Sequence, residues 1–269
     1  MVAATGDAVE RVASRVRALA ADYVPPDYAE VPGPDAALFL CAIDHRTGYR
    51  REHTVDRDGP YSGSALLWAL GLRAEGRRPG LLSAAGLSAA DTRTVLEMFA
   101  IERENIAGAD ARAALWRDLA AGLKRDYGGS AETLLAACDR RLRGDRGLIA
   151  RLVEREAFSD PVAKKSFLFA KIAVRRGWFE VDDPEAWEVC ADNVLMRLAL
   201  RAGLVPPGPL DELRPATRAA LKEVAGEAGL SPPVLDDLLW ELGRDDPDLL
   251  GTAAGELTEP PRDPDSHWY

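Results

Sequence analysis

Apolar residues recur at helical spacing through most of this 269-residue chain, and this periodicity constrains the fold more strongly than any other feature of the sequence. A first amphipathic helix is marked by Val9, Val12, Val16 and Leu19. The proline pair at 25 and 26 ends that helix. From residue 62 onward the spacing predicts successive helices at roughly 62–75, 88–104, 109–126, 130–143, 146–157, 161–176, 184–202, 215–229 and 231–243.

Several of these helices carry recognisable start signals. Asp160, Asp183 and Ser231 each stand directly before a proline, which puts a capping residue ahead of a proline at the first helical position. Ser88, with Asp91 three residues later, resembles a capping box. These signals predict where four of the helices begin.

Strand signals are confined to one stretch near the N-terminus. Residues 36–43 form a short apolar run, polar residues follow at 44–49, and residues 50–55 form a second candidate strand. We therefore predict a small β-hairpin near residues 36–57. With so little β pattern elsewhere, the fold class is mainly α, and the short connections favour a compact helical array.

The charge balance argues against a duplex-binding protein. The chain has 34 Lys and Arg against 44 Asp and Glu, which gives a net charge of −10. An acidic protein repels polyanions on average, whereas sequence-independent duplex binding needs many cationic contacts to phosphates. Nucleic acid is therefore disfavoured as a partner, and a small-molecule ligand is expected instead.

Compartment and metal content follow from what the sequence lacks. The longest apolar run, near residues 65–72, is far too short for a membrane span, and the N-terminus shows no export signal. Three cysteines lie far apart, at Cys41, Cys138 and Cys190, and neither His53 nor His267 has partners at metal-ligand spacing. We expect a cytoplasmic protein with no membrane partner, no metal and no cofactor.

Two ionisable residues, Lys165 and Asp192, stand on apolar stripes of expected helices. Helical spacing puts Lys165 on one face with Val162, Leu168, Phe169 and Ile172. The same spacing puts Asp192 with Val189, Leu195, Met196 and Ala199. An isolated buried charge is costly, but an ammonium and a carboxylate that meet in a half-buried cleft offset this cost and have the shifted pKa values that catalysis needs. A buried structural ion pair, or a lysine that reaches to water, gives the same pattern.

Several short motifs, in order, resemble the queuosine 5′-phosphate N-glycosylase (queuosine salvage) family. They are Gly59-Pro60-Tyr61-Ser62-Gly63-Ser64 before an apolar helix, Tyr127-Gly128-Gly129-Ser130, Lys165 to Phe169, Ala191-Asp192, Leu235 to Trp240, and the final Trp268-Tyr269. The resemblance spans about residues 36–269. Asp44-His45-Arg46 stands where that family has a more aromatic stretch, so base stacking at this position is in question.

The C-terminal half also resembles the archaeal 8-oxoguanine DNA glycosylase family, from Lys165 through Asp192, Ala202-Gly203-Leu204 and Leu235 to Arg244. Both families imply a DNA-glycosylase-like helical array in which a lysine and an aspartate face a cleft between two subdomains. Here we expect one domain, with subdomains at roughly 1–145 and 146–257 and an extended tail at 258–269. Both families tend to follow the aspartate with Tyr-Arg, whereas Asn193-Val194 follow it here, which leaves the recognised base or phosphate open.

The resemblance implies an enzyme, an N-glycosidase that acts on a modified purine-like nucleoside 5′-monophosphate such as queuosine 5′-phosphate. Asp192 would stabilise the oxocarbenium-like transition state or activate water. The resemblance also implies that Asp192 directly precedes a helix that begins at Asn193, whereas periodicity alone equally allows one continuous helix from Pro184. Lys165 would stay charged in a hydrolase. In the alternative, a DNA glycosylase and lyase for oxidised purines, it would form a Schiff base as a neutral amine. A third alternative is a non-catalytic nucleotide-binding helical protein.

The remaining candidates are substrate-binding residues, each with a plainer explanation. Tyr61 and Ser62, with Ser64, stand at a loop-to-helix junction that suits a phosphate or is simply a helix cap. Asp44 and His45 suit recognition of a base, or form a solvated turn. Asp236 and Trp240 stand one turn apart in the shared motif, where packing also explains them. Trp268 and Tyr269 suit closure of a cleft, or dock the end of the chain.

Overall fold

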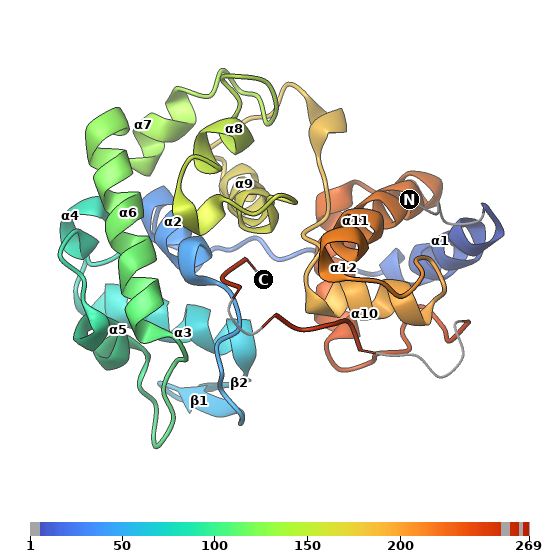
Figure 1. The fold of residues 1–269 in the computed structure, drawn as a ribbon, viewed down its shortest axis with the longest axis horizontal. Coiled ribbons are helices and arrows are strands. Elements are labelled where there is room, and N and C mark those ends of the chain that lie inside the picture. The colour runs from blue at the N-terminus through green and yellow to red at the C-terminus, as the bar shows by residue number, and fades with distance from the viewer. Residues whose placement is uncertain (1–5, 254–258, 264–265, 269) are drawn as a thin grey trace. The chain divides into compact units, whose positions relative to one another are not determined.

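The computed structural model describes residues 6–253, 259–263 and 266–268, and within them the chain is mainly helical with one two-stranded sheet (Figure 1). The mainly α class is therefore confirmed. In the described part of the tail, residues 259–263 and 266–268, there is neither helix nor strand. None of the helices in the described ranges is long and apolar enough to cross a membrane.

The chain divides into two compact units. Unit 1 contains residues 1–27 and 184–266, and unit 2 contains residues 28–183 and 267–269. This division differs from the expected one at residue 145, because the first helix groups with the C-terminal helices and unit 2 runs on to residue 183. Packing of helices that are distant in sequence, which local periodicity does not encode, decides this grouping.

Unit 1 is built from helices α1 (Gly6–Ala20), α10 (Asn193–Arg201), α11 (Leu210–Ala228) and α12 (Pro232–Gly243), with a short 3₁₀ helix, η2 (Pro184–Ala186). Helix α1 packs mainly against α11. Val12 and Val16 of α1 and Leu221 and Val224 of α11 are fully buried, as an amphipathic stripe requires. The apolar spacing of the first helix therefore predicted its buried face correctly.

Helix α11 begins five residues before the expected start at Pro215. Proline is common in the first turn of a helix, and the predicted start at residue 215 falls on a proline. The helix instead runs through this proline, because Leu213 and Thr217 on either side of it are both buried.

Unit 2 contains the sheet and the remaining helices: α2 (Pro34–Ile43), β1 (His53–Val55), β2 (Asp58–Tyr61), α3 (Gly63–Arg77), α4 (Ala84–Leu87), α5 (Thr92–Phe99), α6 (Ala109–Tyr127), α7 (Ala131–Ala136), α8 (Leu148–Leu152), η1 (Glu156–Phe158) and α9 (Lys164–Arg175). Helix α2 is its centre and packs against α3, α6, α7 and α9 (Figure 1). Every residue from Ala36 to Ile43 is buried. The core of unit 2 therefore surrounds α2 on all sides.

The strand expected at residues 36–43 was wrong, because these residues form α2. A short run that is apolar on every face fits a buried strand and a buried helix equally well. Pro34 in the first turn is the local signal that favours the helix. The hairpin lies later in the chain, where β1 and β2 pair antiparallel with His53 opposite Tyr61.

Three expected helix starts also differ from the structure. Helix α5 begins at Thr92, because Asp91 is its N-cap and forms the capping box with Thr94 rather than with Ser88. Helix α9 begins at Lys164 rather than Pro161, because Ala163 adopts a left-handed conformation (φ 52°). The helix expected at 184–202 is only the short η2, followed by extended chain and then α10. In addition, the helices expected at 130–143 and 146–157 are the shorter α7 and α8.

Candidate functional site

Lys165 on α9 is completely buried in unit 2, with 0% of its surface exposed. Its Nζ donates a hydrogen bond to the carbonyl oxygen of Ala42 (2.6 Å) and lies 3.1 Å from Nδ1 of His45. The carbonyls in the last turn of a helix have no partners inside that helix, and Ala42 stands in the last turn of α2. Burial lowers the pKa of Lys165 well below 10.5, the neighbouring Lys164 lowers it further, and Asp44 opposes the shift.

Asp44 directly follows α2 and accepts hydrogen bonds from side chains of two helices, α3 and α9. Its carboxylate accepts hydrogen bonds from Ser64 Oγ (2.8 Å) and Trp68 Nε1 (3.3 Å), both on α3. Lys164 Nζ donates to the main-chain carbonyl of Asp44 (3.1 Å) and lies 3.8 Å from its carboxylate. Only 5% of Asp44 and 7% of His45 is exposed, so the solvated turn considered for this pair was wrong.

His45 is neutral at neutral pH in this environment. Burial lowers its pKa well below 6.5, and the nearby Lys165 and Arg112 lower it further. Its ring meets the ring of His267 in a T-shaped arrangement, with centroids 6.3 Å apart. The ring is therefore held between Lys165 on one side and the chain end on another.

Arg112 on α6 fixes the turn that carries these residues. Its guanidinium donates to the main-chain carbonyls of His45 and Ala107 and, at 3.1 Å, to that of Arg46. Burial lowers the pKa of Arg112 to about 10. We call Asp44, His45, Arg112, Lys164 and Lys165, with Ser64 and Trp68, the buried polar cluster.

Four groups at or beside this cluster were not among the predicted site residues: Trp68, Arg112, His267 and Lys164, the direct neighbour of the predicted Lys165. Trp68 stands one helical turn after Ser64, so the spacing of this pair was the available signal. Arg112 is one arginine among many in an amphipathic helix, and nothing in the sequence distinguishes it. The contact of His267 with His45 joins residues far apart in the chain and leaves no local pattern.

Tyr61 and Ser62 directly precede α3. Of the three predicted residues at this junction, Ser64 is the one that forms a hydrogen bond with Asp44. The Tyr61 hydroxyl donates to the carboxylate of Asp58, which raises the pKa of Tyr61. Ser62 precedes α3, but its side chain makes no capping hydrogen bond. The phosphate-binding role of these residues stays a prediction.

Asp192, Asp236 and Trp240 belong to unit 1. Asp192 is the N-cap of α10, and its Oδ1 accepts from the main-chain N–H groups of Val194 (2.9 Å) and Leu195 (3.0 Å). The expected helix start at Asn193 is therefore confirmed, and the single helix from Pro184 was wrong. Val189 precedes α10, so the helical face counted through Val189 and Asp192 was wrong as well. The expected pairing of Asp192 with Lys165 stays a prediction.

The other two candidates of unit 1 have structural partners. The buried carboxylate of Asp236 accepts from the main-chain N–H of Cys190 (2.6 Å), which ties α12 to the segment before α10. Trp240 lies under the guanidinium of Arg244, 5.4 Å from the ring centroid. Packing explains both residues as well as ligand binding does. Tyr269 lies outside the described residues.

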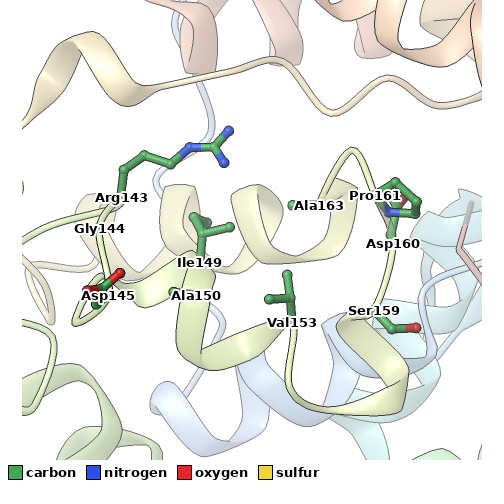
Figure 2. A pocket seen from close by; sticks show the side chains of 10 residues that line it. All are labelled: Arg143, Gly144, Asp145, Ile149, Ala150, Val153, Ser159, Asp160, Pro161 and Ala163. Atoms are coloured by element: carbon green, nitrogen blue, oxygen red, sulfur yellow. The ribbon is translucent and has the colours of Figure 1, made fainter.

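A hollow of about 470 Å³ lies in unit 2 beside α8 and the loop before α9 (Figure 2). It is lined by Arg143, Gly144, Asp145, Ile149, Ala150, Val153, Ser159, Asp160, Pro161 and Ala163. None of the predicted site residues lines it. Within the described residues, no group of three or more His, Cys, Asp or Glu side chains is arranged to hold a metal ion.

The chain has a distant likeness to a solved structure. No family model matches the chain, and no curated protein sequence matches it. The chain is similar to a crystal structure of an 8-oxoguanine DNA glycosylase from Pyrobaculum aerophilum in complex with 8-oxoguanosine. That likeness has a TM-score of 0.44 and 17% sequence identity, and it covers 88% of this chain and 80% of the other. At this level of similarity, the chemistry must be argued from the site itself.

Proposed function

We propose that the protein is an N-glycosidase that hydrolyses the N-glycosidic bond of a modified purine-like nucleoside 5′-monophosphate, queuosine 5′-phosphate or a relative. The observation that carries this proposal is the environment of Lys165. Among the described residues, no carboxylate lies within ion-pair distance of its Nζ, whose partners are a carbonyl and a neutral histidine. A buried lysine with a purely structural role is expected to have a charged partner, and strongly perturbed groups gather at functional sites.

The chemistry of the bond explains why the chain would need such a group. Cleavage leaves positive charge on the sugar, so a fixed carboxylate stabilises the transition state more than the ground state. Asp192 is our candidate for this carboxylate, because the positive end of α10 favours its ionised form. Asp44 and His45 are the candidates for recognition of the base.

Release of free queuine from queuosine 5′-phosphate tests this proposal, with Asp192→Asn as the decisive variant. Asparagine is as good an N-cap as aspartate, so this substitution removes the charge and keeps the start of α10. We expect activity to fall by about 10²-fold or more. An Asp192→Asn enzyme as active as the wild type would overturn the mechanism.

Asp91→Asn is the matched control for that experiment. Asp91 caps α5 in the same way, through an acceptor bond from the main-chain N–H of Thr94 (2.7 Å), and it is exposed. We expect Asp91→Asn to leave the release of base unchanged. An equal loss in both variants would mean that the assay reports helix capping rather than catalysis.

A DNA glycosylase with lyase activity is the second candidate, and the lowered pKa of Lys165 favours it, because a Schiff base needs a neutral amine. The complete burial of Nζ and the net charge of −10 oppose it. Borohydride trapping on a duplex with 8-oxoguanine separates the two candidates: a trapped adduct that is lost in Lys165→Met supports the lyase. If the protein neither forms a trapped adduct nor releases the base, the third candidate, a non-catalytic nucleotide-binding protein, is favoured.

A further inference from the structure

His45 is held from three directions, and only 7% of its surface is exposed. Lys165 approaches Nδ1, Arg112 binds its main-chain carbonyl, and His267 lies against its ring. The chain end is itself anchored, because His267 Nε2 lies 2.9 Å from the carbonyl of Glu156 and Trp268 Nε1 lies 3.3 Å from Ser159 Oγ. These contacts fix the orientation of the His45 ring.

The contact with Lys165 determines which ring nitrogen of His45 carries the hydrogen. In the proposed hydrolase Lys165 stays charged, and a charged lysine amine only donates, while a neutral imidazole has one donor and one acceptor nitrogen. If Lys165 donates to Nδ1, as it does to the carbonyl of Ala42, then the hydrogen of His45 must be on Nε2. The charged and titratable groups that act on His45, namely Lys164, Lys165, Arg112 and His267, all oppose a second proton on its ring.

The other side of the ring lacks a partner. No described residue forms a hydrogen bond with Nε2, and Nε2 is not one of the fully buried side-chain atoms without a partner, so this edge of the ring belongs to the 7% of His45 that is exposed. A donor at the accessible edge of an otherwise buried and fixed ring is available to a ligand. A ligand at this edge of the ring therefore meets a single N–H donor in a fixed orientation.

We propose that Lys165 is a positioning residue that fixes the Nε2–H tautomer of His45, and that this N–H donates to a carbonyl or ring nitrogen of the bound nucleobase. The identity of the ligand rests on the proposed function. The tautomer rests only on a charged Lys165 and on contacts within unit 2. Lys165 thus acts on the ligand through His45 rather than by touching it.

The ring nitrogens can be observed directly in the full chain with ¹⁵N-labelled histidine. The chain has 3 histidines, so His53→Gln and His267→Gln assign the signals. We expect His45 to show a bare Nδ1 and a protonated Nε2 at neutral pH. The reverse pattern in the wild-type protein, with hydrogen on Nδ1, would overturn the proposal, and this result needs no variant that must fold.

Lys165→Met tests the cause of the tautomer, and Lys164→Met is its control. Methionine keeps the length of the side chain but removes the donor, so the fixed pattern of His45 should be lost. Lys164 donates to Asp44 and not to His45, so its substitution should leave the pattern intact. An unchanged spectrum in a folded Lys165→Met protein would show that the lysine does not set the tautomer.

Two substitutions of His45 test the ligand. Glutamine places an amide N–H near the position of Nε2, whereas asparagine reaches only to that of Nδ1. In the queuine-release assay we expect Asn to raise KM about tenfold over Gln, the value of one hydrogen bond, with little change in kcat. Equal KM values would refute the donor role, whereas a wild-type protein without activity that still shows the predicted tautomer would refute the proposed function alone.

Discussion

At the scale of single residues, His45 gives the stability of the protein a dependence on acid. Its folded-state pKa lies below 6.5, so as pH falls below 6.5 the unfolded chain takes up a proton that the folded chain does not. Stability is therefore lost as pH decreases through this range, by at most about 1.4 kcal/mol per pH unit from this one proton.

His45→Gln removes that proton. We expect the free energy of unfolding of this variant, measured by urea denaturation at a series of pH values, to decrease less steeply than the wild type below pH 6.5. The comparison is between slopes, so an overall shift in stability from the substitution does not affect it. Parallel curves would contradict the assignment of His45 as a buried neutral group.

The sequence predicted the burial of Lys165 but not its surroundings. Phe169 and Ile172 follow it on one face of α9, so periodicity was enough to show that the side chain points inward, although Val162, which was counted on the same face, precedes the helix. Its partners come from the end of α2, more than a hundred residues away, and no local pattern connects them. Asp192 shows the opposite case, because its role as an N-cap is local, whereas the chain before it is extended.

At the scale of elements, α3 approaches α2 closely at Gly71. A Cβ at this position would clash with Leu40 Cδ2, and Leu40 is fully buried, so it cannot turn away without displacing its neighbours. We expect Gly71→Ala to destabilise the protein by about 1–2 kcal/mol in chemical denaturation, despite the better helix propensity of alanine.

Gly76 in the same helix provides the control for that measurement. It is exposed, and a Cβ there meets nothing within 4 Å. Gly76→Ala should therefore stabilise the protein, by up to about 1 kcal/mol. Destabilisation of similar size in both variants would mean that helix packing does not explain the glycine at 71.

The elements themselves were predictable to different degrees. Helix α6, which has one apolar face, was correct to within a residue, because its period is unambiguous. Helix α2 is buried on every face and so has no period to read. The Asp160-Pro161 pair marks a turn rather than a helix start: Asp160 binds the main-chain N–H groups of Val162 and Lys164 (3.1 and 3.0 Å), and the left-handed Ala163 interrupts the helix.

At the scale of the whole molecule, the net charge of −10 bears on the choice between nucleotide and duplex. Binding to duplex depends on the release of counterions by cationic side chains, and the average field of this protein opposes it. By fluorescence anisotropy at physiological salt we expect a dissociation constant on the order of 10⁻⁴ M or weaker for duplex with 8-oxoguanine. Saturable binding in the nanomolar range would favour the DNA glycosylase.

The three buried thiols allow the opening of each unit to be measured separately. Cys41 and Cys138 are buried in unit 2, and Cys190 is buried in unit 1. Burial raises the pKa of the Cys41 thiol and raises that of Cys138 to about 11, and a protonated, covered sulfur does not react with alkylating reagents. Each sulfur is therefore modified only when the residues around it unfold locally. The rate of alkylation at Cys41 reports local unfolding of unit 2, and the rate at Cys190 reports that of unit 1.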